Sequence, residues 1–286
     1  MCALAGVSRT GYYRHWRASR PRQEETALRD RIQKLALANR HYGYRRVTAL
    51  LKREGVPVNH KRVLRIARED NLLCLRRRRF VPVTTQSGHR FKIWPNLARW
   101  FTPTALDQLW VADITYIRLD EEFAYLAVVI DACSRRVIGW DLADHLRAEL
   151  ALAALHMALA SRTVTPGLIH HSDRGIQYAC AAYIATLERH AIQPSMSRAG
   201  CPYDNAMAEA FMKTLKQEEV DASAYRDQDH ARQAISAFLE TVYNRQRLHS
   251  ALDYRTPAEY EAAFKIATPG LPAAQQASLA LQTLTP

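Results

Sequence analysis

The sequence predicts an α/β protein in which a mixed sheet with helices on its faces follows a basic, all-helical region. Between residues 109 and 142, three short segments rich in β-branched and aromatic residues follow one another closely, as in an antiparallel meander. From residue 147 onward, helical and strand-like segments alternate, which indicates a mixed sheet covered by helices. The 286 residues, 48% of them hydrophobic, are enough to bury such a core.

Positive charge is concentrated in the first third of the chain. The formal net charge is +12, but residues 1–100 hold 24 basic and 6 acidic side chains, so the remainder is net acidic. A polyanion such as DNA is the natural partner of this region, because each neutralised phosphate releases condensed counterions. General solubility is the alternative explanation. The sharp division of charge along the chain favours DNA.

Within this basic region the residue pattern predicts a helix-turn-helix. Apolar residues recur at helical spacing over 24–37 and 45–52, Gly55 ends the second helix, and Asn59 can cap a third. In a helix-turn-helix the last helix enters the major groove of DNA. A helical hairpin with a solvated basic face is the alternative. The residues expected to contact DNA are Lys61, Arg62, Arg65 and Arg68 on this helix and Arg76, Arg77, Arg78 and Arg79 directly after it.

Changes in composition divide the chain. Residues 1–79 form the basic helical region, and residues 80–106, with prolines among Thr, Ser and Gly, are typical of a linker. We expect one domain over 107–265 and a poorly ordered tail over 266–286. Neither a signal peptide nor a segment able to span a membrane is recognisable, so we expect a cytoplasmic protein. The 5 scattered cysteines argue against a disulfide framework.

Each element of the sheet region follows from a simple pattern. Segments dense in Val, Ile, Trp and Tyr predict strands, because these side chains suit a pleated, half-buried surface. Longer segments with apolar residues at helical spacing predict helices. In order, the expected elements are strands 109–117, 123–131 and 136–142, helix 147–161, strand 167–171, helix 179–190, strand 192–196, and helices 205–216 and 229–243.

Three carboxylates occupy unusual positions in these elements. Asp113 lies within an apolar strand, where an ionised group is costly unless it is paired, hydrogen-bonded or bound to a metal. Asp173 follows the next short strand, at an end where acidic residues project into a crevice, although a simple turn before Gly175 is the alternative. Glu209 shares a helix face with Lys213 and Lys216. In the functional interpretation Glu209 reaches the crevice and both lysines follow a phosphate backbone. An intrahelical pair with Lys213 is the alternative.

Such a set of carboxylates can bind divalent metal ions. Mg²⁺ prefers hard oxygen ligands and retains waters that substrate phosphates can replace. Two such ions activate the attacking oxygen and stabilise the leaving oxygen in phosphodiester chemistry. Combined with a basic DNA-binding region, the carboxylates indicate phosphodiester cleavage or transfer.

Four motifs carry a family resemblance. They are Trp110-x-x-Asp113-x-Thr115-Tyr116, then His170-His171-Ser172-Asp173-Arg174-Gly175-x-Gln177-Tyr178, then Ser195-Met196-Ser197-Arg198-x-Gly200-x-x-x-Asp204-Asn205-Ala206-x-x-Glu209, and Tyr243-Asn244-x-x-Arg247-x-His249-Ser250-Ala251-Leu252. With the 35 residues between Asp173 and Glu209, they resemble the OrfB-type transposases of bacterial insertion sequences, which are related to retroviral integrases.

This resemblance implies an RNase H-like catalytic core with Asp113, Asp173 and Glu209 as the catalytic triad, binding two Mg²⁺ or Mn²⁺ ions. Lys216 matches a basic position used near the DNA end. The implied enzyme is a polynucleotidyl transferase that nicks an element end and joins the freed 3′ hydroxyl to another phosphodiester. Its implied partners are terminal repeats, target DNA, an upstream OrfA-type protein or fusion, and further copies of itself on DNA. A metal-dependent nuclease of the same fold and a non-catalytic DNA-binding regulator are the alternatives.

Overall fold

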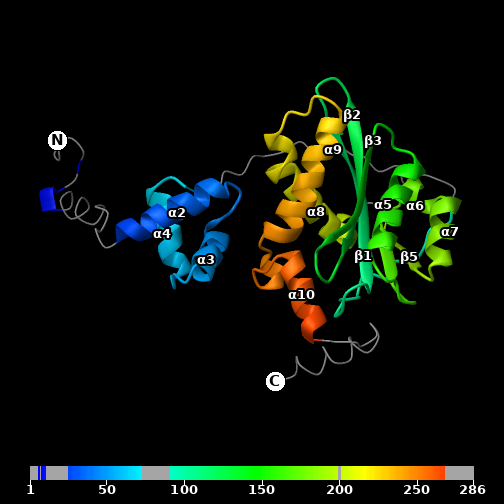
Figure 1. The fold of residues 1–286 in the computed structure, drawn as a ribbon, viewed down its shortest axis with the longest axis horizontal. Helices are drawn as coiled ribbons and strands as arrows, with labels where there is room; N and C mark the ends of the chain where they lie inside the picture. The colour runs from blue at the N-terminus through cyan, green and yellow to red at the C-terminus, as the bar shows by residue number, and fades with distance from the viewer. Residues whose placement is uncertain (1–5, 7, 11–24, 73–90, 199–200, 268–286) are drawn as a thin grey trace. The chain divides into compact units, whose positions relative to one another are not determined.

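The structure is a computed structural model that describes residues 6, 8–10, 25–72, 91–198 and 201–267 (Figure 1). The chain divides into two compact units, residues 1–78 and 79–286. The predicted DNA-binding run Arg76, Arg77, Arg78 and Arg79 lies outside the described residues, as does the tail from residue 268 onward. None of the described helices is long and apolar enough to cross a lipid bilayer.

Three helices pack against one another in the first unit. They are α2 (Thr26–Ala38), α3 (Tyr44–Arg53) and α4 (His60–Glu69). Val47 and Leu51 of α3 and Ile66 of α4 are buried between them. The side chain of Asn59 accepts a hydrogen bond from the backbone N–H of Lys61 at 2.8 Å, so it caps α4 as the sequence predicts.

Five strands form one mixed sheet in the second unit. They are β1 (Leu109–Arg118), β2 (Phe123–Asp131), β3 (Val137–Ala143), β4 (Ile169–Ser172) and β5 (Gln193–Met196). The first three are antiparallel and joined by short turns, whereas β4 and β5 run parallel to β1. Across the sheet the order is β3, β2, β1, β4, β5, so β1 is the central strand. The predicted meander and mixed sheet are confirmed.

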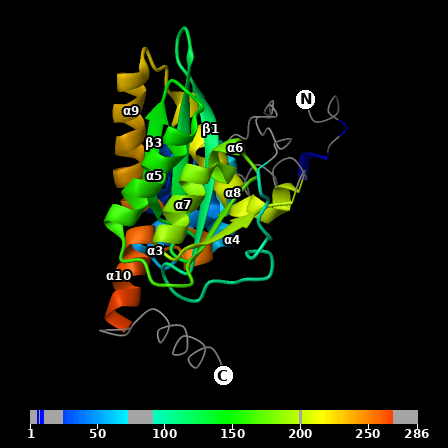
Figure 2. The same cartoon turned by 90° about the vertical axis from the view of Figure 1, so that its right-hand side faces the viewer.

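Helices cover both faces of this sheet (Figures 1 and 2). They are α5 (Ala148–Ser161), α6 (Ile176–Ala179) and α7 (Ala181–Arg189) on one face, and α8 (Ala206–Glu218) and α9 (Gln228–Ala237) on the other. Successive strand residues point to opposite faces, so Val111 and Ile117 of β1 pack with α8, whereas Trp110 and Ala112 pack with α5 and α7. Two hydrophobic cores therefore lie on either side of β1.

The helix predicted over 229–243 is interrupted in the structure. Helix α9 ends at Ala237 and a π-helix, η4 (Phe238–Gln246), continues it. The side-chain amide of Asn244 donates to Val137 O, and its oxygen accepts from Val137 N, both at 3.0 Å. Asn244 thus completes the hydrogen bonding at the start of β3, an interaction that periodicity along the chain does not reveal. The remaining elements are η2 (Pro202–Asn205), η3 (Val220–Ala222), η5 (Ser250–Leu252) and α10 (Pro257–Ala267).

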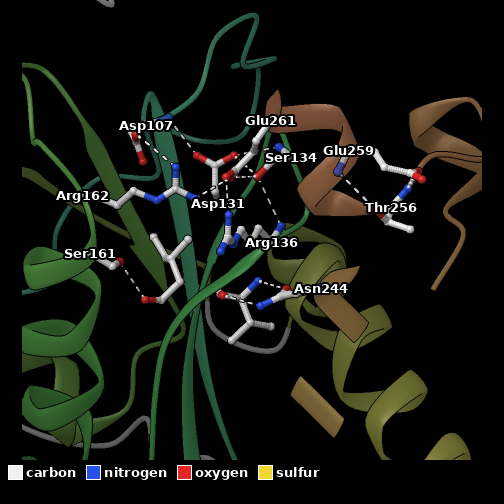
Figure 3. A network of polar contacts seen from close by, with 12 residues as sticks. Asp107, Asp131, Ser134, Arg136, Ser161, Arg162, Asn244, Thr256, Glu259 and Glu261 are labelled. Carbon is white, nitrogen blue, oxygen red and sulfur yellow. Dashed lines mark hydrogen bonds and ion pairs between the residues drawn. The ribbon is translucent and has the colours of Figure 1, made fainter. Parts of the chain in front are cut away.

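A buried polar network fastens α10 to the sheet (Figure 3). Asp131, at the end of β2, accepts hydrogen bonds from N and Oγ of Ser134 at 2.7 and 2.9 Å. Ser134 Oγ also lies 2.8 Å from Glu261 of α10, which pairs with Arg136 and Arg162. Burial raises the pKa of Asp131 to about 6. Burial also acts to raise the pKa of Glu261, but the nearby charge of Arg162 holds the pKa of Glu261 below its ordinary value. Removing one member would leave an uncompensated buried charge, so the network fixes the position of α10.

Helix α5 approaches the sheet so closely that only glycine fits at residue 139 of β3. A Cβ atom there would lie 2.2 Å from Ala154 O and 2.7 Å from Ala158 N, both in the backbone of α5. We expect Gly139→Ala to lower the free energy of unfolding by about 1–3 kcal/mol or more, because the helix must shift. Urea unfolding followed by circular dichroism measures this change. The control is Gly43→Ala, where a new Cβ meets no atom within 4 Å. Equal stability of the two variants would contradict the close packing.

Candidate active site

Asp113 is the fifth of the 10 residues of β1 and lies on the sheet face that α8 covers. Val111 and Ile117 point to this face, and Asp113 follows the same alternation. The backbone N–H of Ile114 donates to Asp113 Oδ1 at 2.9 Å. Within the described residues Asp113 forms no ion pair. The free-energy cost of burying an ionised Asp113 is therefore not offset by a cation in direct contact with it.

Asp173 reaches the same place from the neighbouring strand. β4 pairs with β1 in parallel, with Val111 opposite His171. Asp113 and Asp173 each follow this last pair by two residues, and after burial the charge of Asp173 is the largest cause that raises the pKa of Asp113. The backbone N–H of Gly175 donates to Asp173 Oδ1 at 2.9 Å, so the turn considered as an alternative is also present. Asp173 thus both shapes a turn and adjoins the central carboxylate.

The two adjacent histidines of β4 are buried and hold neighbouring elements together. His171 Nδ1 lies 2.8 Å from Ser195 Oγ, and its Nε2 lies 3.0 Å from Ser197 Oγ. His170 Nε2 lies 2.9 Å from the hydroxyl of Tyr183. Burial lowers the pKa of both rings, that of His170 to about 3, so both are neutral at physiological pH. These contacts give the histidines a structural role.

The start of α8 is tied directly to β1. Asn205 Nδ2 donates to Ala112 O at 3.1 Å, one residue before Asp113. Glu209 follows Asn205 by four residues and so lies on the same helix face. Partial burial raises the pKa of Glu209, although much of its side chain is exposed. In the described part of the chain no ion pair joins Glu209 to Lys213, so the intrahelical pair considered as an alternative is not formed.

Two lysines extend from α8 beyond Glu209. Lys216 Nζ lies 4.1 Å from the centroid of the Tyr116 ring, and its charge acts to lower the pKa of Asp113. Lys213 is exposed. Glu209, Lys213 and Lys216 therefore follow one another along α8, with Lys216 positioned over Tyr116 of β1.

Mutual repulsion characterises the three carboxylates. Burial, followed by repulsion from Asp173 and then Glu209, raises the pKa of Asp113 to about 7. Among the described residues, however, no three His, Cys, Asp or Glu side chains lie close enough to hold one metal ion. The two observations agree, because Coulomb repulsion acts over about 10 Å whereas ligation of Mg²⁺ needs oxygens at about 2 Å. The donor set suits Mg²⁺, which is usually held by one or two carboxylates, waters and substrate phosphates.

A charged clamp that the sequence pattern did not reveal shapes the connection from β5 to α8. Asp204 accepts hydrogen bonds from N and Nε of Arg198, at 2.8 and 2.9 Å. The Arg198 guanidinium holds the pKa of Asp204 well below its ordinary range. The clamp closes the chain just before Asn205, which anchors α8. It therefore supports the position of Glu209 through the backbone.

Arg247 fixes the other end of α8. Its Nε and Nη2 atoms each donate to the carboxylate of Glu218 at 2.9 Å, and Nη2 lies 3.3 Å from Thr214 Oγ1. Arg247 is buried with 6% of its surface exposed. This gives the arginine a structural role at the end of α8.

The basic residues of α4 divide into two sets. Arg62 and Arg65 both pair with Glu25, at 3.2 and 2.6 Å, and Arg65 also pairs with Glu69 at 2.9 Å. Lys61 and Arg68 are exposed, and within the described residues they form no ion pair. The second set is thus available to DNA without loss of an internal contact, whereas the first set holds α4 against the start of α2.

Comparison with known proteins shows what the chain resembles. Residues 103–202 and 190–257 match two family models described as an integrase core domain, and residues 22–80 match an HTH-like domain. The 31 kDa protein of insertion element IS600 from Shigella sonnei is 38% identical, over 91% of this chain and 97% of that protein. The transposase InsF for insertion sequence IS3A from Escherichia coli is 37% identical, over 91% and 92%. A chain of the simian T-cell lymphotropic virus intasome has a TM-score of 0.49 at 17% identity, over 82% and 74%.

The raised pKa of Asp113 predicts a stability change in the metal-free protein. In the folded state the carboxylate titrates at a pKa of about 7, against about 4 when unfolded, so its ionisation destabilises the fold increasingly from pH 4 to 7. At pH 8, in a chelator, we expect Asp113→Asn to unfold at a higher temperature than the parent. Its free energy of unfolding should be higher by up to a few kcal/mol. The difference in stability between the variant and the parent should decrease as the pH falls toward 4. A constant or negative difference across this range, measured by thermal melting, would contradict the repulsion.

Proposed function

The chain belongs to the family of insertion-sequence transposases with an integrase core domain, and from this we propose that it cuts and joins DNA strands at the ends of its own element. The resemblance drawn from the four sequence motifs is thereby confirmed. The observation that supports the chemistry is that Asp173, just after β4, and Glu209, on α8, both lie near enough to Asp113 of β1 for their charges to raise its pKa beyond the effect of burial. Among the described residues Asp113 forms no ion pair, and in addition to being buried its carboxylate is repelled by Asp173 and Glu209.

In the proposed reaction these three carboxylates hold divalent metal ions, two of Mg²⁺ or Mn²⁺. When bound, the ions supply activation of the attacking oxygen and stabilisation of the leaving oxygen. Asp113, Asp173 and Glu209 would hold the ions and would offset part of their charge. Asn205 and the Arg198–Asp204 clamp hold the start of α8 against β1 and so position Glu209. The protein thus contributes the placement of the reacting groups and the negative charge of the carboxylates.

The DNA strand undergoes two related substitutions at phosphorus. In the first, water attacks a phosphodiester at the element end, the P–O3′ bond breaks, and the released 3′ oxygen takes a proton. In the second, that 3′ hydroxyl attacks another phosphodiester, a new P–O3′ bond forms, and the displaced 3′ oxygen is released. Lys216, held over Tyr116, is placed to stabilise the phosphate backbone of the DNA end.

The helical unit is proposed to hold the DNA. Helix α4 is the recognition helix, and the proposed contacts are Lys61, Arg62, Arg65, Arg68, Arg76, Arg77, Arg78, Arg79 and, from α8, Lys213 and Lys216. Lys61 and Arg68 are the strongest of the α4 candidates, because Arg62 and Arg65 are engaged by Glu25. An upstream OrfA-type partner and assembly of several copies on DNA complete the proposal.

The proposed reaction predicts metal-dependent joining of labelled element ends. The full chain, alone and with the product of any overlapping upstream frame, is incubated with labelled ends and Mg²⁺ or Mn²⁺. We expect joined products that disappear in Asp113→Asn, Asp173→Asn and Glu209→Gln, because each change removes a negatively charged ligand. Glu240→Gln is the matched control, since Glu240 is an exposed carboxylate on η4. Cleavage without joining would indicate a nuclease. DNA binding without cleavage in the unaltered chain would indicate a regulator.

A second prediction separates the two sets of basic residues on α4. Lys61→Ala and Arg68→Ala should each weaken binding to duplex DNA and reduce the slope of log affinity against log salt by about 1, because one phosphate contact is lost. Arg65→Ala should instead lower the melting temperature, since Glu25, with 2% of its surface exposed, loses its shortest ion pair. Fluorescence anisotropy across a salt series and thermal melting test both. Lys34→Ala, which removes an exposed cation of α2, is the control. If the Lys61 or Arg68 variant binds DNA as this control does, the assignment of α4 as the recognition helix is contradicted.

A further inference from the structure

A basic and aromatic segment outside the active site crosses the surface of the second unit. Residues 91–101, called here the strap, were predicted to belong to a linker, yet they are described and packed against the core. Trp100 exposes 84% of its surface, the largest exposed fraction among the apolar side chains of the strap. The strap contains two basic residues, Lys92 and Arg99, and no acidic residue. The exposed apolar side chains are Phe91, Ile93, Leu97, Trp100 and Phe101.

The strap lies at the β5 edge of the sheet. The backbone N–H of Leu97 donates to Ser195 Oγ of β5 at 2.8 Å. On either side of this contact, Trp94 packs against the core beneath α5 and α7, and Ala98 packs against the core beneath α8. The strap therefore passes from one face of the sheet to the other and covers an edge strand.

Its anchor also places the strap near the carboxylates. Ser195 Oγ lies 2.8 Å from His171 Nδ1, and His171 precedes Asp173 by two residues on β4. β5 is separated from β1 only by β4, so at about 4.8 Å per strand the anchor lies roughly 10 Å across the sheet from β1. A DNA strand that extends a few nucleotides from the active site can reach it.

Cations lie over both indole rings of the strap. Lys92 Nζ is 3.8 Å from the centroid of the Trp94 ring, and Arg99 Cζ is 4.6 Å from that of Trp100. A turn closed by the hydrogen bond from Phe101 N to Ala98 O, at 3.2 Å, presents Trp100 to solvent. The cation–π contact orients the exposed indole before any ligand arrives, which reduces the entropy lost on binding.

Unpaired nucleic-acid bases suit this surface better than other partners. An exposed indole stacks on a base of any sequence, and neighbouring cations attract the phosphates. Bases inside a duplex are already stacked and offer no face to Trp100. A second copy joined through the same strap would bring four cations together without an acidic partner.

We propose that the strap binds unpaired bases of the DNA end beside the active site, with Trp100 stacked on one base and Arg99 and Lys92 contacting phosphates. The inference deepens the proposed function, because strand cleavage leaves unpaired nucleotides near the carboxylates. It assigns a role in positioning DNA to a segment that contains no catalytic group.

Photocrosslinking tests this placement without requiring catalysis. The full chain is mixed, in a chelator, with an element-end duplex that carries a short single-stranded overhang containing 5-iodouracil. After irradiation, mass spectrometry identifies the crosslinked residue. We expect Trp100 to be crosslinked by the overhang and not by a blunt duplex with internal 5-iodouracil. Asp113→Asn should give the same crosslink. An unaltered chain that gives the crosslink but never joins strands in Mg²⁺ or Mn²⁺ would refute the proposed function and leave the proposal for the strap intact.

Affinity for a single-stranded oligonucleotide provides the second readout. Trp100→Ala should weaken binding at least about fivefold, as loss of one stacked base does, while Trp100→Phe should stay close to the parent. Arg99→Ala should weaken binding and reduce the salt slope by about 0.7. Arg189→Ala, an exposed cation at the end of α7, is the control.

Two outcomes would overturn the proposal. One is the absence of a Trp100 crosslink together with unchanged affinity in Trp100→Ala. The other is a lower molar mass of Trp100→Ala than of the parent, measured by sedimentation without DNA. That result would mean that in the parent the strap joins copies of the chain. Circular dichroism checks that the variants retain the parent fold.

Discussion

The parallel pairing of β4 with β1 is the interaction on which the candidate active site depends. It brings Asp173 alongside Asp113, and no local interaction in the sequence would place these residues together. Parallel neighbours require a crossover, which α5 provides, and the backbone of α5 fits against β3 only because residue 139 is glycine. A constraint on the far side of the sheet thus determines where the carboxylates meet.

The surrounding structure resists the repulsion that this pairing creates. Like charges brought together would push β4 and α8 away from β1 unless other contacts held them. His171 fastens β4 to the serines of β5, Asn205 fastens α8 to the carbonyl of Ala112, and Arg247 holds the far end of α8 through Glu218. These polar contacts are buried, so water does not readily replace them. The rigidity of the site comes from neutral and paired groups that surround the three carboxylates.

Much of the fold could be predicted from the sequence because it depends on local patterns. Alternating apolar residues predict the strands, and Asn59 predicts the start of α4. The π-helix, the Arg198–Asp204 clamp and the Arg162–Glu261 pair could not be predicted, since each depends on which groups tertiary packing brings together. The same limit applies to α4, where four basic residues look alike in the sequence. Only the position of Glu25, more than thirty residues earlier, separates Arg62 and Arg65 from the two exposed cations.

The spacing of the carboxylates also bears on how a metal-dependent site can remain folded without metal. Three acidic side chains held within ligation distance would repel strongly, and the cost would fall entirely on the stability of the metal-free protein. In this structure the repulsion is shared between the raised pKa of Asp113 and the exposure of Glu209, which water can solvate. Glu209 lies on a helix whose anchor, Asn205, is one turn away, and its side chain is exposed to water. In the proposed site, solvation of Glu209 therefore limits the free-energy cost to the metal-free protein.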